Sequence, residues 1–163
     1  MLARRVAGAA IGISLLVAVS GCTPAEIAEA HREIHASVGQ LEKALRDEAR
    51  FGNPKLMKAY IDDPDDGTYL GVTAAEPAVP ESYESDAMIY GATVDGQEIT
   101  VRAAFRGHGE TGGGWSYKSA NQVLCVTFTV LTGTDVRVDI ADDHCPDFIL
   151  SGAQEQSLSD VSL

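Results

Sequence analysis

One apolar stripe at helical spacing, between residues 24 and 51, constrains the fold of this chain most. The positions between its apolar residues are mostly charged, which predicts an amphipathic α-helix about 40 Å long. Thr23 and Glu26 could form a capping box at the start of this helix, and Gly52 and Pro54 would end it. The stripe must pack either on a sheet or on another helix. Its apolar residues are spaced three, four and seven positions apart: Ile27, Ile34, Val38, Leu41 and Leu45.

Residues 86–150 alternate between apolar and polar side chains in short runs, which is the period of β-strands. Asp95-Gly96 between the first two runs is typical of a tight hairpin. The second run has one apolar face, and its other face, with Arg102 and Arg106, is expected to be wet. We therefore expect an α+β domain in which the long N-terminal helix packs on a three- to five-stranded antiparallel meander. The runs cover residues 87–94, 99–106, 122–131 and 136–140.

The first 22 residues have the features of an export signal. Arg4 and Arg5 precede an apolar run that ends at Val19 and is shorter than the roughly 20 residues that a membrane-spanning helix needs. The run Val19-Ser20-Gly21-Cys22 resembles the lipobox of bacterial lipoproteins. The resemblance implies cleavage after Gly21, diacylation of the Cys22 thiol by fatty acids such as palmitate, and a mature protein on the extracytoplasmic face of the cell membrane. The other interpretation is an ordinary secretory signal with a coincidental cysteine.

The chain is expected to contain one folded unit. Residues 1–21 are the predicted signal peptide, and residues 22–150 form a single ectodomain of a size that suits one modest core. Within it, residues 62–85 contain prolines and an acidic turn and are expected to be a loop. Residues 151–163 are polar and lack a period, so a disordered tail is expected there.

The chain is strongly acidic, with a formal net charge of −12. Loss of Arg4 and Arg5 with the signal leaves 10 Lys and Arg against 24 Asp and Glu, which gives the mature chain a charge of −14. Nucleic acid and anionic headgroups repel such a surface, so we expect no nucleic-acid partner and attachment to the membrane through the lipid anchor. Frequent Ala and Gly with scarce Lys is similar to the composition of high-GC bacteria such as actinomycetes.

Three cysteines are present, and Cys22 is assigned to the lipid. An exported protein folds in an oxidising compartment, so Cys125 and Cys145 are expected to form a disulfide. A metal site or a redox pair is the alternative, but the two cysteines are much farther apart than in a Cys-x-x-Cys redox motif.

The most unusual segment is residues 107–114, which contain five glycines. No Lys-Ser or Lys-Thr ends it, which excludes a phosphate-binding P-loop. We expect it to be a mobile hairpin connection with Trp115 packed on the edge of the sheet. The alternative is a flexible loop that binds a ligand or partner through His108, Glu110, Trp115 and Tyr117.

Two groups of side chains could contribute to a metal site, although neither predicts one with a complete set of ligands. His31 and His35 lie one helical turn apart, a spacing at which two imidazoles can share a metal ion. Asp142, Asp143 and His144 gather three further ligand types beside Cys145. For the two histidines we favour solvated residues at the boundary of the stripe, and a disulfide at Cys145 would remove the softest ligand of the other group.

No residue set argues for an enzyme, because no Gly-x-Ser-x-Gly elbow or free cysteine with a plausible base is present. The sequence favours a non-enzymatic, surface-anchored envelope lipoprotein that binds an envelope protein or a small ligand and needs no cofactor. A metal- or cation-binding lipoprotein is the alternative, and a hydrolase with an unrecognised site is the third.

Overall fold

The computed structural model describes residues 23–62, 73–74, 87–150 and 152–161. The predicted signal peptide, Cys22 and most of the predicted loop 62–85 lie outside the described residues. The elements in chain order are α1 (Ala25–Ala49), α2 (Pro54–Asp62), β1 (Thr73–Ala74), β2 (Ala87–Asp95), β3 (Glu98–Thr111), the 3-10 turn η3 (Gly114–Ser116), β4 (Lys118–Leu131), β5 (Arg137–Asp142), β6 (Gln154–Gln156) and α3 (Leu158–Val161).

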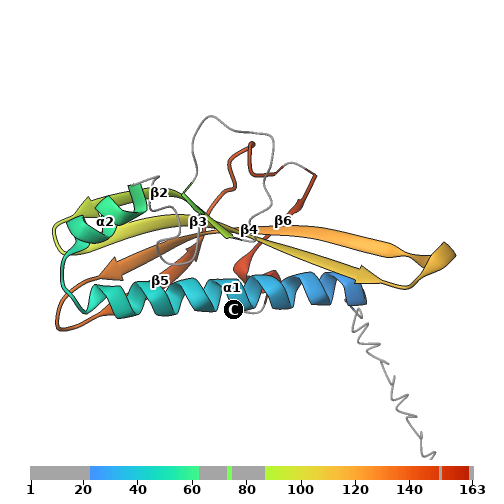
Figure 1. Ribbon diagram of the computed structural model, residues 1–163, viewed down its shortest axis with the longest axis horizontal. Helices are drawn as coiled ribbons and strands as arrows, with labels where there is room; N and C mark the ends of the chain where they lie inside the picture. The colour runs from blue at the N-terminus through green and yellow to red at the C-terminus, as the bar shows by residue number, and fades with distance from the viewer. Residues whose placement is uncertain (1–22, 63–72, 75–86, 151, 162–163) are drawn as a thin grey trace, which may run out of the picture.

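The sheet contains an antiparallel meander. Strands β2, β3, β4 and β5 pair with one another in chain order, and α1 lies along the sheet beneath β3 and β4 (Figure 1). The predicted α+β class, with a helix packed on an antiparallel sheet, is therefore confirmed. Two short parallel strands, β1 beside β2 and β6 beside β4, were not predicted.

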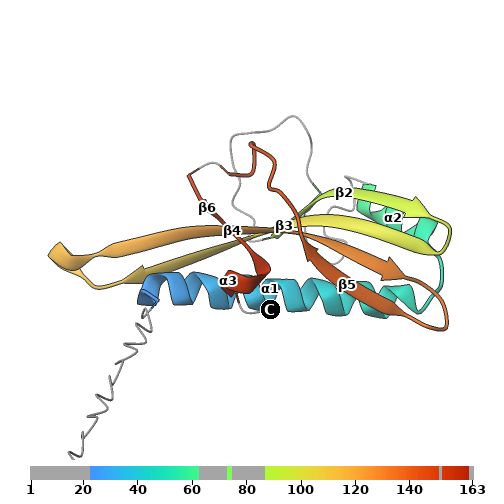
Figure 2. The same cartoon turned by 180° about the vertical axis from the view of Figure 1, so that it is seen from behind.

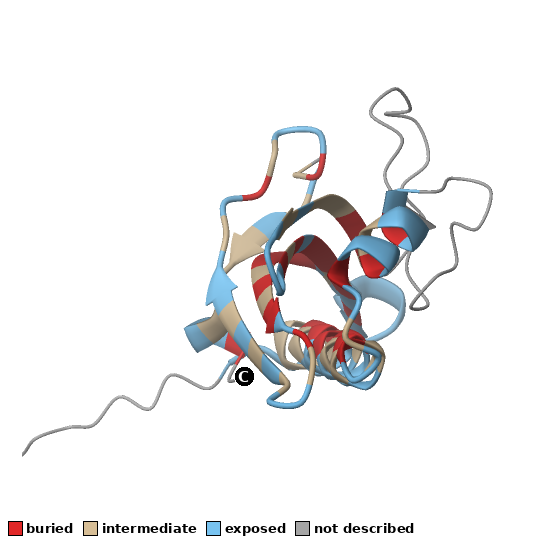
Figure 3. Ribbon diagram, turned by 90° about the vertical axis from the view of Figure 1, so that its left-hand side faces the viewer, coloured by how far each residue is buried: buried red, intermediate tan, exposed pale blue. Residues whose placement is uncertain are grey.

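The main core lies between α1 and one face of the sheet, which curls around the helix (Figure 3). Phe105 of β3 and Phe128 of β4 meet there edge to face, with ring centroids 6.2 Å apart. Ile27, which we placed in the stripe, is only half-buried, whereas Ala30 and Ala49 are fully buried. The remaining four residues of the predicted stripe are buried as expected: Ile34, Val38, Leu41 and Leu45.

The second face of the sheet is only partly wet, contrary to our expectation, because Arg102 is exposed but Arg106 is half-buried. The chain turns back after β5 and lays Cys145 and Ile149 over it, where they form a small second core with Ala104. The expected Cys125–Cys145 disulfide is present, with the two Cα atoms 5.3 Å apart, and it fastens this returning segment to β4. The Arg106 guanidinium donates a hydrogen bond to the carbonyl of Ile149 at 2.6 Å.

The expectation of a disordered tail from residue 151 is also wrong for the described residues. Residues Gln154–Gln156 form β6, and α3 after it contacts α1 (Figure 2). The side chain of Gln156 is within hydrogen-bond distance of His31, 3.2 Å, and Val161 is buried against the main core. Backbone pairing with β4 holds this segment, so no apolar period was needed to make it a strand.

The start of α1 differs from the predicted capping box. Pro24 is the N-cap, and no side chain caps the helix there. Glu26 accepts a hydrogen bond from the Thr111 hydroxyl of β3 at 2.8 Å, across the helix–sheet interface. Of the helices that the described residues form, none has the length and apolar character needed to cross a membrane.

Candidate functional site

The glycine-rich segment that we expected to be a loop is largely strand. β3 runs through residues 107–111 to Thr111, and β4 begins at Lys118, so that only residues 112–117 form the connection. Among the described strands, β3 and β4 pair only with each other over residues 107–111 and 118–121. We call residues 107–121 the hairpin arm and residues 112–117 its tip. The arm runs past the other strands toward the end of the molecule where α1 begins (Figure 1).

Two glycines of the arm allow α1 to lie directly on the backbone of β3. A Cβ atom placed on Gly107 would lie 2.0 Å from the carbonyl oxygen of Ala30, and one on Gly109 would lie 1.7 Å from that of Glu26. Both separations are far below any real contact, so a side chain at either position would force the helix away. These glycines therefore serve helix–strand packing, and the mobile connection that we weighed is wrong for this part of the segment.

Carboxylates of α1 cover the outer edge of β3 in the arm. Glu33 accepts a hydrogen bond from the N–H of His108 at 2.8 Å, and Glu29 accepts one from the N–H of Glu110 at 3.2 Å. Four residues of helix rise about 6 Å and two residues of strand about 6.8 Å, so the spacings of the two sets match. Unpaired strand N–H groups are thus satisfied by side chains where a neighbouring strand is lacking among the described residues.

The opposite face of the arm carries a group of hydrogen-bonded polar side chains, which we call the polar cluster: His108, Glu110, Tyr117 and Asn121. The ring nitrogens of His108 lie 2.6 Å from Asn121 Oδ1 and 2.8 Å from Glu110 Oε1, and the Tyr117 hydroxyl donates to the same Glu110 oxygen at 2.5 Å. The cluster therefore joins three of the predicted binding residues. It also contains Asn121, which sequence reasoning missed because only the strand register places it opposite His108.

Mutual hydrogen bonding shifts the pKa values of three members of the polar cluster. The bond to Glu110, followed by that to Asn121, raises the pKa of His108. The bonds from His108 and Tyr117 lower the pKa of Glu110, and the Glu110 carboxylate raises the pKa of Tyr117. Half of the His108 and Glu110 side-chain surface is open to water, with exposed fractions of 50% and 52%. The cluster is thus a preformed, solvated polar surface.

Trp115 does not join the polar cluster and does not pack on the sheet edge. It stands fully exposed on the 3-10 turn at the tip. Gly112 shortly before this turn and Gly114 at its start have φ angles of +82° and +59°, which favour glycine. The tip is thus folded so that it presents an indole ring to the surroundings.

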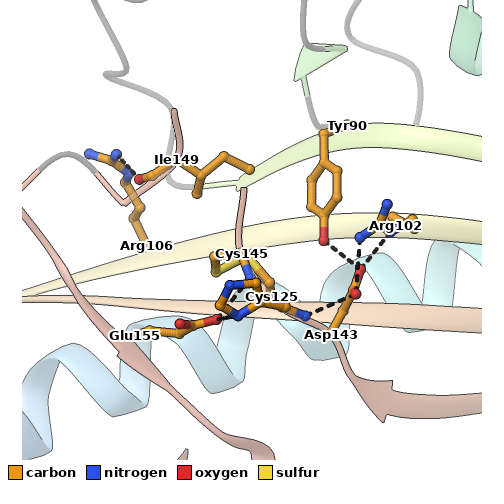
Figure 4. Close-up of a disulfide and its surroundings, with 9 residues drawn as sticks. Tyr90, Arg102, Arg106, Cys125, Asp143, Cys145, Ile149 and Glu155 are labelled. Carbon is orange, nitrogen blue, oxygen red and sulfur yellow. Dashed lines mark hydrogen bonds and ion pairs between the residues drawn. A yellow bond between two sulfur atoms is a disulfide. The ribbon is translucent and has the colours of Figure 1, made fainter. Parts of the chain in front are cut away.

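A second polar group lies beside the disulfide (Figure 4). Asp143 binds Arg102 through two hydrogen bonds of 2.6 and 3.0 Å, and it accepts a third from the Tyr90 hydroxyl at 2.7 Å. The Arg102 guanidinium also lies 5.0 Å from the centre of the Tyr90 ring. The bonds from Arg102 lower the pKa of Asp143 to about 2. Each group has its partners, so this cluster holds the returning segment to the sheet.

The predicted metal ligands do not come together in a coordination site. Asp142, Asp143 and His144 line an open depression of about 500 Å³, but Asp142 accepts the Leu158 N–H. The neighbouring Glu155 accepts the Cys145 N–H and lies 3.2 Å from His144. These carboxylates therefore serve the chain itself.

The helix histidines likewise do not form a site with other ligands. His31 lies against Gln156, and His35 is exposed to solvent. Within the part of the chain that the structure describes, no group of three His, Cys, Asp or Glu side chains is placed to hold a metal ion.

Comparisons of the chain with protein-family models, with curated proteins and with solved structures return no match.

Proposed function

We propose that this protein is a lipid-anchored module of the extracytoplasmic face of a bacterial cell membrane, and that it acts by binding rather than by catalysis. The hairpin arm is its binding element. The partner is an envelope protein or a small ligand that recognises the polar cluster. The observation that carries the proposal is the arm itself, which presents hydrogen-bonding side chains and an exposed tryptophan beyond the rest of the sheet.

The anchor is supported by the export signal and by the start of the fold. Only Thr23 and Pro24 separate Cys22 from the first residue of α1. Acyl chains on Cys22 would therefore hold α1 and the sheet packed on it close to the bilayer. The test is the Cys22→Ala variant, which should lose labelled fatty acid and remain uncleaved. Labelling that persists in this variant refutes the anchor.

Binding fits the geometry of the arm better than catalysis does. Enzyme sites are concave and shield the reacting groups from water. The polar cluster instead lies on an exposed strand pair, and its histidine, carboxylate and phenol already satisfy one another. A flat surface with hydrogen-bonding groups and aromatic rings is typical of recognition between proteins.

The binding role is tested by site-specific photo-crosslinking in intact cells. A photoreactive side chain at Ser119, which is exposed and lies opposite Glu110, should give one discrete adduct with an envelope component, and His108→Ala in the same chain should remove it. The matched control is the same side chain at Asp135, which is exposed in the connection between β4 and β5 at the opposite end of β4. The same adducts from both positions, or none from Ser119, would overturn the binding role of the arm.

A further inference from the structure

The tip of the arm presents an aromatic surface that no part of the described chain covers. Trp115 is fully exposed, and Tyr117 is 54% exposed, although its hydroxyl binds Glu110. The indole and phenol rings each combine an apolar body with a polar group. Side chains of this kind concentrate at the boundary between lipid headgroups and acyl chains.

The tip lies close to the point where the chain would leave the bilayer. Thr111 at the end of β3 and Glu26 in the first turn of α1 are joined by a hydrogen bond of 2.8 Å. Trp115 follows Thr111 by four residues, and Cys22 precedes Glu26 by four residues. Four extended residues span at most about 14 Å, so the chain cannot place Trp115 farther than that from Thr111, or Cys22 farther than that from Glu26.

The charge of this end also suits contact with lipid. The mature chain is strongly acidic, yet no Asp or Glu occurs between Glu110 and Asp135, and Lys118 stands directly beside the tip. The nearby carboxylates of Glu26 and Glu29 are turned to β3, where they accept hydrogen bonds. The acidic side chain that contacts the tip, Glu110, is itself hydrogen-bonded to His108 and Tyr117, so the tip can approach headgroups with little unpaired negative charge.

From these placements we propose that the tip is a second contact with the bilayer that holds the acyl chains on Cys22. Trp115 enters the interface between headgroups and acyl chains, and Tyr117 lies at headgroup level. This inference rests on the proposed lipid anchor. Two contacts at one end of the molecule would fix its orientation, with α1 leading away from the membrane and the polar cluster just above the headgroups.

The experiment uses Trp115 as its own probe, because it is the single tryptophan of the chain. The full-length acylated protein is reconstituted into phosphatidylcholine vesicles, with and without lipids brominated near the headgroup end of the acyl chain. We expect a blue shift of the tryptophan emission relative to an unacylated chain that starts at Thr23, in buffer. We also expect loss of most of the emission when brominated lipid is present.

The matched control moves the tryptophan to the other end of α1, in a Trp115→Phe, Phe51→Trp variant. Phe51 is 79% exposed, and the 25 residues of α1 place it about 38 Å from the start of the helix. This variant should show neither the shift nor the quenching. Quenching of both proteins would mean that the molecule lies flat on the bilayer, which refutes an end-on contact through the tip.

Mass spectrometry of the reconstituted protein separates this inference from the function on which it rests. Acylated Cys22 together with an unquenched Trp115 overturns the bilayer contact, leaves the anchor intact, and makes the tip available to a protein partner. Absence of acyl chains on Cys22 in protein recovered from the envelope overturns the anchor, and the bilayer contact with it.

Discussion

Replacement of Gly107 by alanine is the sharpest test of how α1 and β3 are joined. The added methyl carbon would lie 2.0 Å from the Ala30 carbonyl oxygen and 2.9 Å from a side-chain carbon of Ile34. Real Cβ contacts essentially never fall below 3.0 Å, so α1 must move from β3 by about 1 Å or more at this point. The obstacle is helix backbone, which cannot rotate away as a flexible side chain could.

The cost follows from the contacts that such a movement opens. A large buried aliphatic side chain makes about 50 contacts of 0.1–0.2 kcal/mol each, and a gap of up to 1 Å forfeits about a quarter to a half of that energy. For the fully buried Ile34 alone this amounts to about 2–4 kcal/mol. Overpacked cores usually lose about 1–3 kcal/mol. We therefore expect Gly107→Ala to lower the free energy of unfolding by about 3 kcal/mol.

The assay is urea unfolding of the chain from Thr23 onward, followed by far-ultraviolet circular dichroism. The matched control is Gly113→Ala at the tip, where an added Cβ would meet nothing within 4 Å and φ is −164°, an extended angle that alanine adopts freely. This control should be neutral, or stabilising by up to about 1 kcal/mol. If Gly107→Ala and Gly113→Ala unfold at the same urea concentration, the helix does not rest on the glycine backbone and the packing argument fails.

Two further predictions concern the second face of the sheet, and a third concerns the candidate metal ligands. The bonds from Arg102 lower the pKa of Asp143 to about 2 from an ordinary value of 3.8. Its contribution to the free energy of unfolding is therefore fully present above pH 3.8 and is lost as the pH falls through about 2. The unfolding free energy of the wild type should therefore drop more steeply than that of Asp143→Asn between about pH 5 and pH 2, and parallel curves would contradict the role of this pair. Reduction of the Cys125–Cys145 disulfide, whose cysteines are 20 residues apart, should cost about 3 kcal/mol in the same urea assay; an unchanged midpoint would mean that the bridge does not stabilise the fold. Zinc or calcium ions should leave the melting temperature unchanged, whereas a specific ion at 100 times its Kd would add about 2.7 kcal/mol and restore the metal-binding alternative.

The sequence predicted those parts of the fold in which apolar residues recur at a regular spacing. The stripe from Ile34 to Leu45 and the alternation from Leu124 to Val130 both mark residues that the structure buries in one core. The disulfide followed from the number of cysteines and the expected compartment. For the helix and the strands one local pattern was sufficient, because the buried face of a helix or a strand repeats along the chain.

The hairpin arm was only partly predictable, because its strand is built from residues that usually signal a loop. In the sequence, Gly107 and Gly109 indicate flexible backbone. Only the position of α1 shows that the absence of side chains at these two glycines makes room for the helix. The polar cluster was predicted as a set of residue types, but its geometry depends on the register that pairs His108 with Asn121. No spacing within the sequence reveals which residue of a distant strand lies opposite another.

The cover of the second face was missed for a related reason. We expected Arg102 and Arg106 to face solvent, because charged residues usually are exposed. Both instead bind the segment that follows β5. The short strand β6 has no alternation of apolar and polar residues that would predict a strand. Its backbone pairing with β4 and the hydrogen bond between Gln156 and His31 position it instead. Such contacts join residues far apart in the chain, and a reading of local patterns does not find them.

The contacts of α1 with elements that come late in the chain also determine when the domain can form. Its hydrogen bonds to the arm join residues 75 to 85 positions apart, and His31 meets Gln156 across 125 positions. A helix of this length forms within about a microsecond, but its apolar stripe has no partner until the hairpin that follows has been made. Folds dominated by such distant contacts assemble slowly, in milliseconds to seconds. A chain that emerges from its amino end must therefore keep the stripe uncovered until nearly all of its residues are available.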